Sequence, residues 1–398
     1  MRVGVNLEQR RHGQWLAHAI EWPGCTWSAE TREQAMAAAP QAVAAFAQWL
    51  WERGETDEPP PHIVTQFAQE AAGEWPEADR YLPPTFASDV VPVQAAEIER
   101  WVRWLGYTRA DLGAVLADAG AEGLQAPAPT DGRERPVADA LARLAAAEWS
   151  VLVRLQLVAG ERPGADFLPE HWEEILTQVR SQVIERVRAT SAEERSRWIK
   201  SPDGESWTLR KALRLLLEGE RAATARVRAA LVSAEVLRSQ RRTGVYGICT
   251  SPLGILVIDK ALGPYKGRFD LPGGGVEPGE APTEALLREF AEETGFQIRL
   301  TEYLGAREFH VRWPRPRHTH LHHTARFYRV EVTGGELKSE PDGRDAYGAR
   351  FVHPDHLTVD ACSPLVRTAV AWINAGLWVE TPGIYDAWGV KRAAAVER

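Results

Sequence analysis

Cysteine is scarce in this chain of 398 residues. Its three cysteines, Cys25, Cys249 and Cys362, are too few and too widely spaced for a disulfide framework or a zinc-ligand pattern. Such a cysteine content suits a reducing compartment, where disulfides rarely persist. We therefore expect a cytoplasmic protein.

Long apolar runs and an excess of basic residues are also missing. No stretch of about 18 apolar residues occurs, so the sequence predicts no membrane span. The first residues, MRVGVNLEQRRHGQW, lack the apolar core of a signal peptide. The net charge of −8 argues against a surface that coats nucleic acid, although it leaves room for a local basic patch. Neither a membrane nor a nucleic acid is expected as a partner.

What the chain contains is the composition of a soluble globular protein, with 44% apolar and 26% charged residues. Its length predicts two or three domains. Near the N-terminus, Val3, Val5 and Leu7 alternate with polar residues and predict a strand, which a second extended run follows. Thr31 then begins an alanine-rich helix, with Gln34 placed for a capping box.

Composition and periodicity divide the rest of the chain. The proline-rich segment GETDEPPPH is typical of a linker. Apolar residues at helical spacing in four later segments predict a four-helix bundle. The period changes across the polar stretch 240–243, which predicts a hinge before a mixed α/β region. The expected multidomain α+β protein has a small β-β-β-α domain at 1–60, a linker at 61–91, the bundle at 92–240, an α/β domain at 241–378 and a tail at 379–398.

The stretch LPGGGVEPGEAPTEALLREFAEETGF, residues 271–296, places many carboxylates beside a run of glycines. Glu289, Glu292 and Glu293 are spaced i, i+3, i+4 and therefore share one face of a helix. Arg288 lies beside them and can bridge to one carboxylate. Because like charges at this spacing repel one another, the three carboxylates favour a hard cation with oxygen ligands, Mg²⁺ or Mn²⁺.

The neighbouring residues fit a helix that packs beside a flexible loop. Pro282 suits the first turn of the helix and Gly295 suits its end, and Leu286 and Phe290 form the stripe expected to be buried. The glycines at 273–275 let the backbone approach a ligand closely. Carboxylates, a divalent metal and such a loop suit a diphosphate, because the metal screens the phosphate charge and a carboxylate can deprotonate water. For an isolated acidic run, a solvated helix face is the alternative.

The full spacing carries more information than the acidic run. From Gly274 it reads Gly, five residues, Glu, seven residues, Arg-Glu-Phe, one residue, Glu-Glu, one residue, Gly-Phe. Every fixed position of the Nudix box is filled, and the region from about 243 to 373 resembles a Nudix hydrolase domain. The resemblance covers about a third of the chain. It implies an α/β/α sandwich with a mixed sheet, and a hydrolase that acts on phosphorus-containing acid anhydrides.

The resemblance also implies metal ligands by motif position. Glu289 and Glu293 match the main metal-binding glutamates, and Glu292 matches the third. One carboxylate of this set serves as general base, and the sequence leaves open which one. Some family members use a further acidic residue outside the box, for which Glu336 and Glu340 are the candidates here.

The remaining box positions are implied to support these ligands. Arg288 matches the arginine that orients the glutamates, and Glu280 matches the box glutamate that pairs with this arginine. Gly273 matches the residue whose carbonyl often touches the metal, whereas Gly274 and Gly295 are structural.

The stretch HTHLHH, residues 318–323, collects four of the chain's 11 histidines. A metal site is possible in principle. The favoured interpretation is a polar loop that runs into a strand near the substrate cleft, because no matching histidine or cysteine partners are evident elsewhere.

The helical region resembles the DinB/YfiT-like four-helix bundles. The residues that carry this resemblance are LARLAAAEWSVLVRL and DGESWTLRKALRLLLEGERAATARV. Many members bind a divalent metal through three histidines, and the matching positions here are Arg143, Gly219 and Ala223. Because none of these can ligate a metal, we expect a bundle used for packing or dimerisation that binds no metal tightly.

The first 53 residues resemble the HicB-like antitoxin fold, through VGVNLEQ, GQWLAHAIEWPGC and the helix ETREQAMAAAPQAVAAF. Small domains of this kind act in partner binding or oligomerisation, so a homo-oligomer formed through the N-terminal domains is one expectation. A β-hairpin packed on a helix for stability alone is the alternative.

The sequence therefore predicts a metal-dependent Nudix pyrophosphohydrolase. It would cleave the diphosphate bond of a nucleoside diphosphate linked to another moiety, using Mg²⁺ or Mn²⁺. The alternative is a nucleotide-sensing regulatory protein whose Nudix domain binds ligand and whose N-terminal domains bind a partner. A metal-dependent activity in the bundle is disfavoured by the missing histidines. ADP-ribose, a dinucleotide, an oxidised nucleoside triphosphate and a nucleotide sugar are not distinguished.

Overall fold

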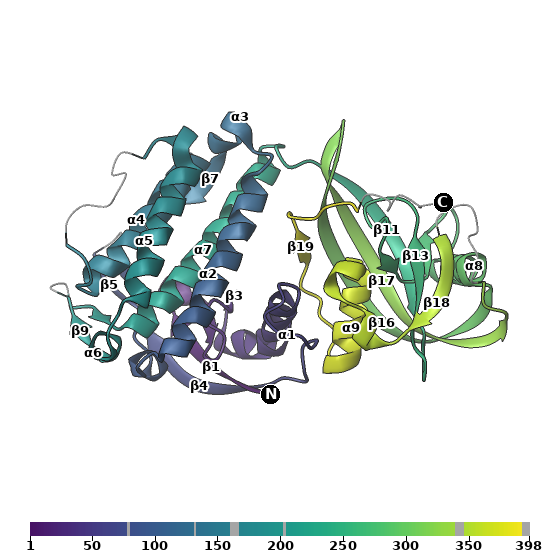
Figure 1. Ribbon diagram of the computed structural model, residues 1–398, viewed down its shortest axis with the longest axis horizontal. Helices are drawn as coiled ribbons and strands as arrows, with labels where there is room; N and C mark the ends of the chain where they lie inside the picture. The colour runs from purple at the N-terminus through teal and green to yellow at the C-terminus, as the bar shows by residue number, and fades with distance from the viewer. Residues whose placement is uncertain (78–79, 131–132, 160–166, 202–203, 339–345, 392–398) are drawn as a thin grey trace. The chain divides into compact units, whose positions relative to one another are not determined.

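The structure is a computed structural model that describes residues 1–77, 80–130, 133–159, 167–201, 204–338 and 346–391. The chain folds into two compact units. Unit 1 comprises Met1–Val43 and Ile63–Leu237, and unit 2 comprises Ala44–His62 and Arg238–Arg398. In Figure 1, unit 1 runs from purple to teal and unit 2 is mainly green and yellow. None of the helices in the described ranges has the length and apolar character needed to cross a membrane.

Unit 1 begins with a four-stranded sheet in the order β3-β2-β1-β4. Its strands are β1 (Arg2–Gln9), β2 (Trp15–Ala19), β3 (Thr26–Ala29) and β4 (Val64–Ala72). Helix α1 (Arg32–Trp51) follows β3, and the predicted capping box at its start is confirmed. The Thr31 Oγ1 accepts a hydrogen bond from the Gln34 amide at 3.2 Å, and the Gln34 side chain accepts one from the Thr31 amide.

Strand β4 corrects the prediction that residues 61–91 are a linker. It pairs in parallel with the whole of β1, from Arg2 opposite Val64 to Gln9 opposite Ala72. Most side chains of β4 are exposed, so its sequence shows no buried apolar face. The backbone hydrogen bonds to β1 define this strand, and apolar periodicity could not reveal it. Shorter elements complete the segment: β5 (Glu74–Glu77), β6 (Arg80–Leu82) and the 3₁₀ turn η2 (Ala87–Val90).

Four long helices form most of unit 1 and lie side by side in Figure 1. They are α2 (Ala95–Leu116), α4 (Val137–Arg154), α5 (Trp172–Arg188) and α7 (Leu209–Ser233). Helix α2 contacts α5 and α7, and α4 contacts the same two helices. The connecting segments hold α3 (Gly120–Leu124), α6 (Ala192–Ser196), the hairpin β7 (Pro127–Thr130) and β8 (Arg133–Pro136), and the short pair β9 (Ile199–Lys200) and β10 (Ser206–Trp207).

The interior of these helices contains a charged cluster. Glu148 and Glu220 have side chains that are 1% and 0% exposed. Arg180 reaches both, with Nη2 at 2.8 Å from Glu148 Oε1 and 3.0 Å from Glu220 Oε2. Arg109 lies between the same two carboxylates and donates to each. The two guanidinium groups thus compensate the buried negative charge, as burial of carboxylates requires.

Unit 2 contains two sheets. The larger has the order β15-β11-β17-β16-β19, and in the smaller β13 pairs with β12, β14 and β18. The strands are β11 (Ser239–Ile248), β12 (Thr250–Ser251), β13 (Gly254–Lys260), β14 (Phe269–Asp270), β15 (Gly273–Gly275), β16 (Phe296–Arg315), β17 (His318–Gly335), β18 (Ala346–Val352) and β19 (Gly383–Tyr385). Strand β17 is parallel to β11 and antiparallel to β16, so the larger sheet is mixed, as predicted.

Two helices, α8 (Pro282–Thr294) and α9 (Pro364–Ala375), pack on opposite faces of the larger sheet. Val245 of β11 belongs to the apolar cluster that holds Leu286 and Phe290 of α8. Its neighbour Tyr246 belongs to the cluster that holds Leu365 of α9. Because successive side chains of a strand point to opposite faces, the two clusters lie on the two sides of the sheet.

The predicted hinge at 240–243 is wrong, because these residues lie inside β11. They pair with residues 321–324 of β17. The prediction that HTHLHH is a loop is also wrong, since all six residues lie in β17. Polar side chains do not prevent a strand whose backbone groups are all paired with neighbours. A local pattern of polar residues therefore misled the sequence interpretation in both places.

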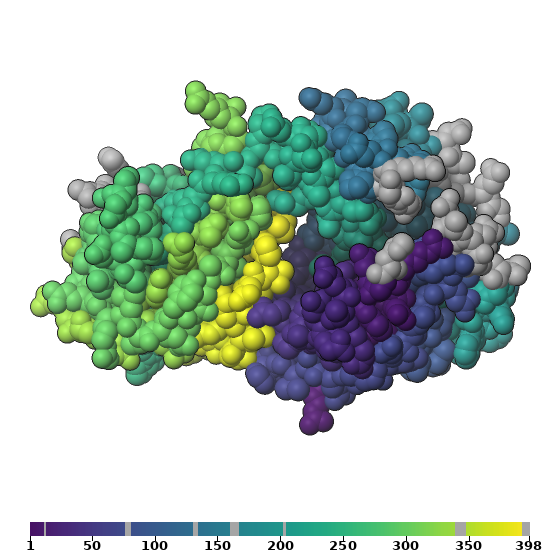
Figure 2. Space-filling view, turned by 180° about the vertical axis from the view of Figure 1, so that it is seen from behind, coloured from purple at the N-terminus to yellow at the C-terminus, as the bar shows by residue number. Residues whose placement is uncertain are grey.

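Both ends of the predicted domain map also need correction. Trp51 lies in the apolar core of unit 2, so the end of α1 belongs with residues far along the chain. Within the predicted tail at 379–398, β19 pairs in parallel with β16. The yellow C-terminal segment is visible at the surface in Figure 2. Residues 392–398 lie outside the described ranges.

Candidate active site

Helix α8 has the termini and the buried stripe that its sequence predicts. Pro282 occupies the first turn, and Gly295 ends the helix with a φ of +78°, a left-handed conformation that glycine adopts readily. Leu286 and Phe290 are both 0% exposed. Their burial fixes the rotation of the helix, and Glu293, seven residues after Leu286, therefore lies on the buried side of α8 beside this stripe.

Glu293 is the most deeply placed of the three acidic side chains, at 5% exposure. Its Oε2 accepts a hydrogen bond of 2.9 Å from the Gly273 amide, and its Oε1 lies 3.6 Å from Lys260 Nζ. Burial raises the pKa of Glu293 to about 8, although Lys260 and the Gly273 amide act in the opposite direction. The negative charge of Glu289 adds to the rise.

Two residues of the glycine loop, Gly273 and Gly274, lie too close to their neighbours for a side chain to fit without displacing atoms. At Gly273, φ is +141° and a Cβ atom would lie 2.1 Å from the Val245 carbonyl oxygen. At Gly274, a Cβ atom would lie 2.5 Å from the carboxylate carbon of Glu289. The loop pairs with β11 as strand β15. Backbone atoms of the loop thus lie directly against the carboxylates of α8.

Arg288 connects the acidic groups. Its Nε and Nη2 donate to both oxygens of Glu280, at 2.9 and 3.0 Å. Its Nη1 donates to Glu289 Oε1 at 3.0 Å, and Nη2 also reaches the Gly275 carbonyl at 3.3 Å. The contacts raise the pKa of Arg288, with the Glu280 hydrogen bond as the largest cause. The guanidinium therefore holds Glu289 against the glycine loop.

Comparison with known proteins assigns this region. Residues 238–372 match the family model described as NUDIX domain. Residues 238–372 are a Nudix domain. An ADP-ribose pyrophosphatase of Methanocaldococcus jannaschii is 39% identical over 102 residues, which is 26% of this chain and 57% of that protein. A putative 8-oxo-dGTP diphosphatase of Bacillus subtilis is 35% identical over 89 residues, 22% of this chain and 52% of that protein.

These curated relatives are matched over only about half of their own length. The solved structure of a NUDIX hydrolase from Nitrosomonas europaea is 17% identical, and the alignment covers 36% of this chain and 79% of that one with a TM-score of 0.29. The DinB-like and HicB-like resemblances of unit 1 stay predictions.

The Nudix domain brings most of the predicted site residues together. Glu289 and Glu293 lie against the glycine loop, whereas Glu292 is 49% exposed and lies 3.8 Å from Arg288. The side chain of Glu336, a candidate outside the box, is exposed. Glu340 lies outside the described residues.

Two charged residues of the Nudix domain were not predicted from the sequence. Lys260 ends β13 and reaches Glu293, as described above. Asp270 is 2% exposed and accepts a hydrogen bond of 2.7 Å from the Ser363 hydroxyl. Burial raises the pKa of Asp270, and Lys260 opposes this rise. The one available sequence signal was the pair of charged residues, Asp259 and Lys260, directly after the apolar run GILVI, which also fits an ordinary strand end.

The residues of the Nudix box fit a hard divalent cation. Glu289, Glu292 and Glu293 offer carboxylate oxygens, which Mg²⁺ and Mn²⁺ prefer. The space that a Cβ atom at Gly274 would fill is the space in which the Glu289 carboxylate lies. Burial raises the pKa of Glu293, and the Glu289 carboxylate, held by Arg288 beside Gly274, adds to this rise, an electrostatic cost that a bound cation would relieve.

Proposed function

We propose that the Nudix domain is a pyrophosphohydrolase that cleaves the diphosphate bond of a nucleoside diphosphate linked to another moiety, with Mg²⁺ or Mn²⁺. The observation that carries the proposal is the packing of Glu293 and Glu289 against Gly273 and Gly274, two positions where a Cβ atom would come within 2.1 and 2.5 Å of a neighbouring atom. The relatives named as an ADP-ribose pyrophosphatase and an 8-oxo-dGTP diphosphatase support a nucleotide substrate.

Each residue has a distinct part in this proposal. Glu289, Glu292 and Glu293 would hold the metal, which supplies charge screening and polarisation of the phosphorus. Arg288 fixes the orientation of Glu289 through its contact at 3.0 Å. A carboxylate of the same set accepts the proton of the attacking water. A protein that only binds a nucleotide has no need of the whole carboxylate set, so the sensor alternative is not favoured.

The substrate can be found by a hydrolysis screen of the full chain. The compounds are ADP-ribose, a dinucleotide, an oxidised nucleoside triphosphate and a nucleotide sugar, each with Mg²⁺ and with Mn²⁺. Phosphate release through a coupled phosphatase is the readout. We expect saturable, metal-dependent turnover of at least one compound that contains a diphosphate, and binding without turnover would favour the sensor.

Replacement of one carboxylate tests the site itself. Glu293→Gln keeps the size of the side chain and helix propensity, but it removes a formal charge and a metal ligand. We expect turnover to fall by roughly 10² to 10⁴-fold, the usual contribution of a positioned acid or base, or by more if the metal is lost.

Glu284→Gln is the matched control on the same helix. Glu284 accepts a hydrogen bond of 2.9 Å from the Ala281 amide at the start of α8, a bond that glutamine can also accept. We expect near-native turnover for this variant and similar melting temperatures for both. Native turnover of Glu293→Gln would show that Glu293 has only a structural part in the packing of α8 against the glycine loop.

A further inference from the structure

A second group of ligand-type side chains lies outside the Nudix box, on the hairpin of β16 and β17. Glu308 and His310 are two residues apart on β16, so both point to the same face of the sheet. His322 of β17 lies directly opposite His310 in the antiparallel register. Between the two ligand residues, Phe309 points to the other face and is 0% exposed.

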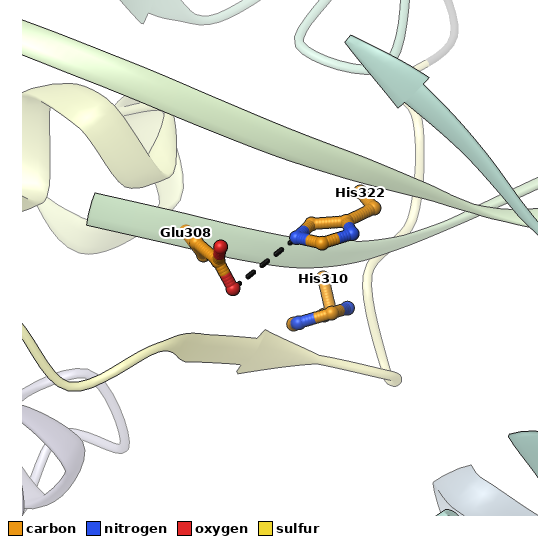
Figure 3. A group of neighbouring side chains, drawn as sticks. All are labelled: Glu308, His310 and His322. Carbon is orange, nitrogen blue, oxygen red and sulfur yellow. Dashed lines mark ion pairs between the residues drawn. The ribbon is translucent and has the colours of Figure 1, made fainter. Parts of the chain in front are cut away.

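The three side chains point toward one another in Figure 3. Each offers one ligand atom, and these atoms all lie within 4.8 Å of one another. His322 Nε2 is 3.2 Å from Glu308 Oε2, and the His310 and His322 rings stack with centroids 4.3 Å apart. Ligand atoms around a tetrahedral zinc ion, with bonds of about 2.0 to 2.1 Å, are separated by roughly 3.3 Å. The Glu308–His322 pair already has this spacing, and His310 offers a ligand atom within 4.8 Å of the other two.

The chemistry of this group differs from that of the Nudix box. Two imidazoles and one carboxylate suit zinc and other borderline transition metals, whereas the carboxylates of the box suit Mg²⁺. The group is also accessible, because the Glu308 and His322 side chains are 48% and 19% exposed. Paired strands provide a more rigid support for such ligands than a loop does.

The group is separate from the catalytic carboxylates. In the parallel register of β11 and β17, His322 is opposite Arg241, whereas Val245 is opposite Arg326 and is paired on its other side with Gly274. His322 is therefore four residues along β17 from the level of Gly274. At about 3.3 Å per residue this is roughly 13 Å. Two metals that share one catalytic centre lie only about 3.5 to 4 Å apart, so the histidine group cannot be part of that centre.

We propose that Glu308, His310 and His322 bind one divalent transition-metal ion of the zinc class. Three protein ligands leave at least one coordination position open to water or to an anionic group. The site is independent of the proposed hydrolysis, because none of its residues belongs to the Nudix box.

Cobalt and zinc binding to the full chain test this proposal. Co²⁺ is titrated into metal-stripped protein, its visible absorption reports nitrogen ligation, and Zn²⁺ is then used to displace it. We expect one such ion in the wild type, with binding weakened by roughly 100-fold or more in His310→Ala and in His322→Ala, because loss of a ligand costs at least as much as loss of a supporting contact. His356→Ala, at an exposed histidine of the same unit outside the group, should bind like the wild type.

Two further experiments distinguish metal binding at this site from metal binding at the Nudix box and from a folding defect in the variants. Glu289→Gln should keep the cobalt absorption, which would exclude the box as its source. X-ray absorption of zinc-loaded wild-type protein should show two imidazole ligands, and it requires no variant. Unchanged binding in both His310→Ala and His322→Ala, or a zinc ion with oxygen ligands only, would overturn the proposal.

Discussion

The box has glycine at position 274, although this residue has no side chain with which to bind a metal. The absent side chain leaves room for the Glu289 carboxylate, which would lie 2.5 Å from a Cβ atom. We expect Gly274→Ala to displace this carboxylate and to lower turnover by about 100-fold, the usual cost of a misplacement of about 1 Å. The melting temperature should change little, because the displaced atoms are the end of a flexible side chain.

Gly275→Ala is the matched control for this prediction. A Cβ atom at Gly275 would meet no other atom within 4 Å, and the residue does not have a positive φ. Steady-state kinetics of both variants on one substrate make the comparison. Equal turnover of the two alanine variants would show that the close approach of Glu289 to the loop has no part in catalysis.

The sequence does not reveal that Lys260 and Asp270 lie near Glu293. Each ends a short strand of the smaller sheet, and each has a position that its neighbours in sequence do not reveal. They lie near Glu293 because β13 and β14 pair with each other. Only that pairing shows that a cation and a further carboxylate belong to the site.

Helix α5 carries the cation on which the buried cluster of unit 1 depends. Arg180 compensates both Glu148 and Glu220, which have almost no access to solvent. We expect Arg180→Met to destabilise unit 1 by about 3 to 5 kcal/mol, because removal of one partner leaves buried charge uncompensated. Urea unfolding followed by circular dichroism measures the change.

Arg188→Met on the same helix is the control. Arg188 pairs with Glu99, but both side chains are about half exposed, at 50% and 52%. Solvent screens such a pair, so we expect little change in the unfolding midpoint. If the two variants unfold alike, the buried cluster does not stabilise the helices.

The charged cluster is relevant to the prediction that the bundle binds no metal tightly. Of the positions matched to histidine ligands, Arg143 is 43% exposed and pairs with Asp139, whereas Ala223 is 3% exposed. Arg109, Arg180 and their two carboxylates form one part of the buried polar interior, which also contains Lys211 and Arg214 of α7. Fixed cationic side chains thus supply the positive charge in the interior of these helices.

The chain as a whole does not divide where its composition changes. Residues 44–62 belong to unit 2, although the Nudix residues begin almost 200 positions later. The Arg307 guanidinium is buried and donates to the Gln48 side chain at 2.7 Å. Arg367 lies 3.3 Å from Glu52, and Trp51 packs into the apolar core of the unit. The Nudix domain is therefore completed by a segment from the other end of the chain.

This arrangement differs from the predicted α/β domain at 241–378, which does not include residues 44–62. We expect a fragment of residues 238–398 to melt well below unit 2 of the full chain, because it lacks Trp51, the Gln48 partner of Arg307 and the Glu52 partner of Arg367. Loss of a buried tryptophan alone costs about 3 to 5 kcal/mol. Thermal unfolding of the fragment and of the full chain makes the comparison.

A peptide of residues 44–62, added in trans, should raise the melting temperature of the fragment as its concentration increases. The same peptide with Trp51→Ala should act far more weakly. A fragment that melts like the full chain and does not respond to the peptide would show that residues 44–62 do not stabilise the Nudix domain.

The acidic helix α8 and the glycine loop beside it could be predicted from the sequence alone. The spacing of Glu289, Glu292 and Glu293, the buried stripe of α8 and the termini at Pro282 and Gly295 all follow from the helical period and from local backbone preferences. Such features depend on residues a few positions apart, so a single stretch of sequence contains them in full.

The tertiary structure decided everything that depends on strand pairing. The β4 strand in the expected linker, the histidines within β17, the proximity of Lys260 to Glu293 and the place of residues 44–62 in unit 2 could not be read locally. Strand partners are distant in sequence, and their register is set by the packing of the whole sheet. The group of Glu308, His310 and His322 is an example. Glu308 and His322 are 14 positions apart in sequence, and they lie close together only because β16 and β17 pair.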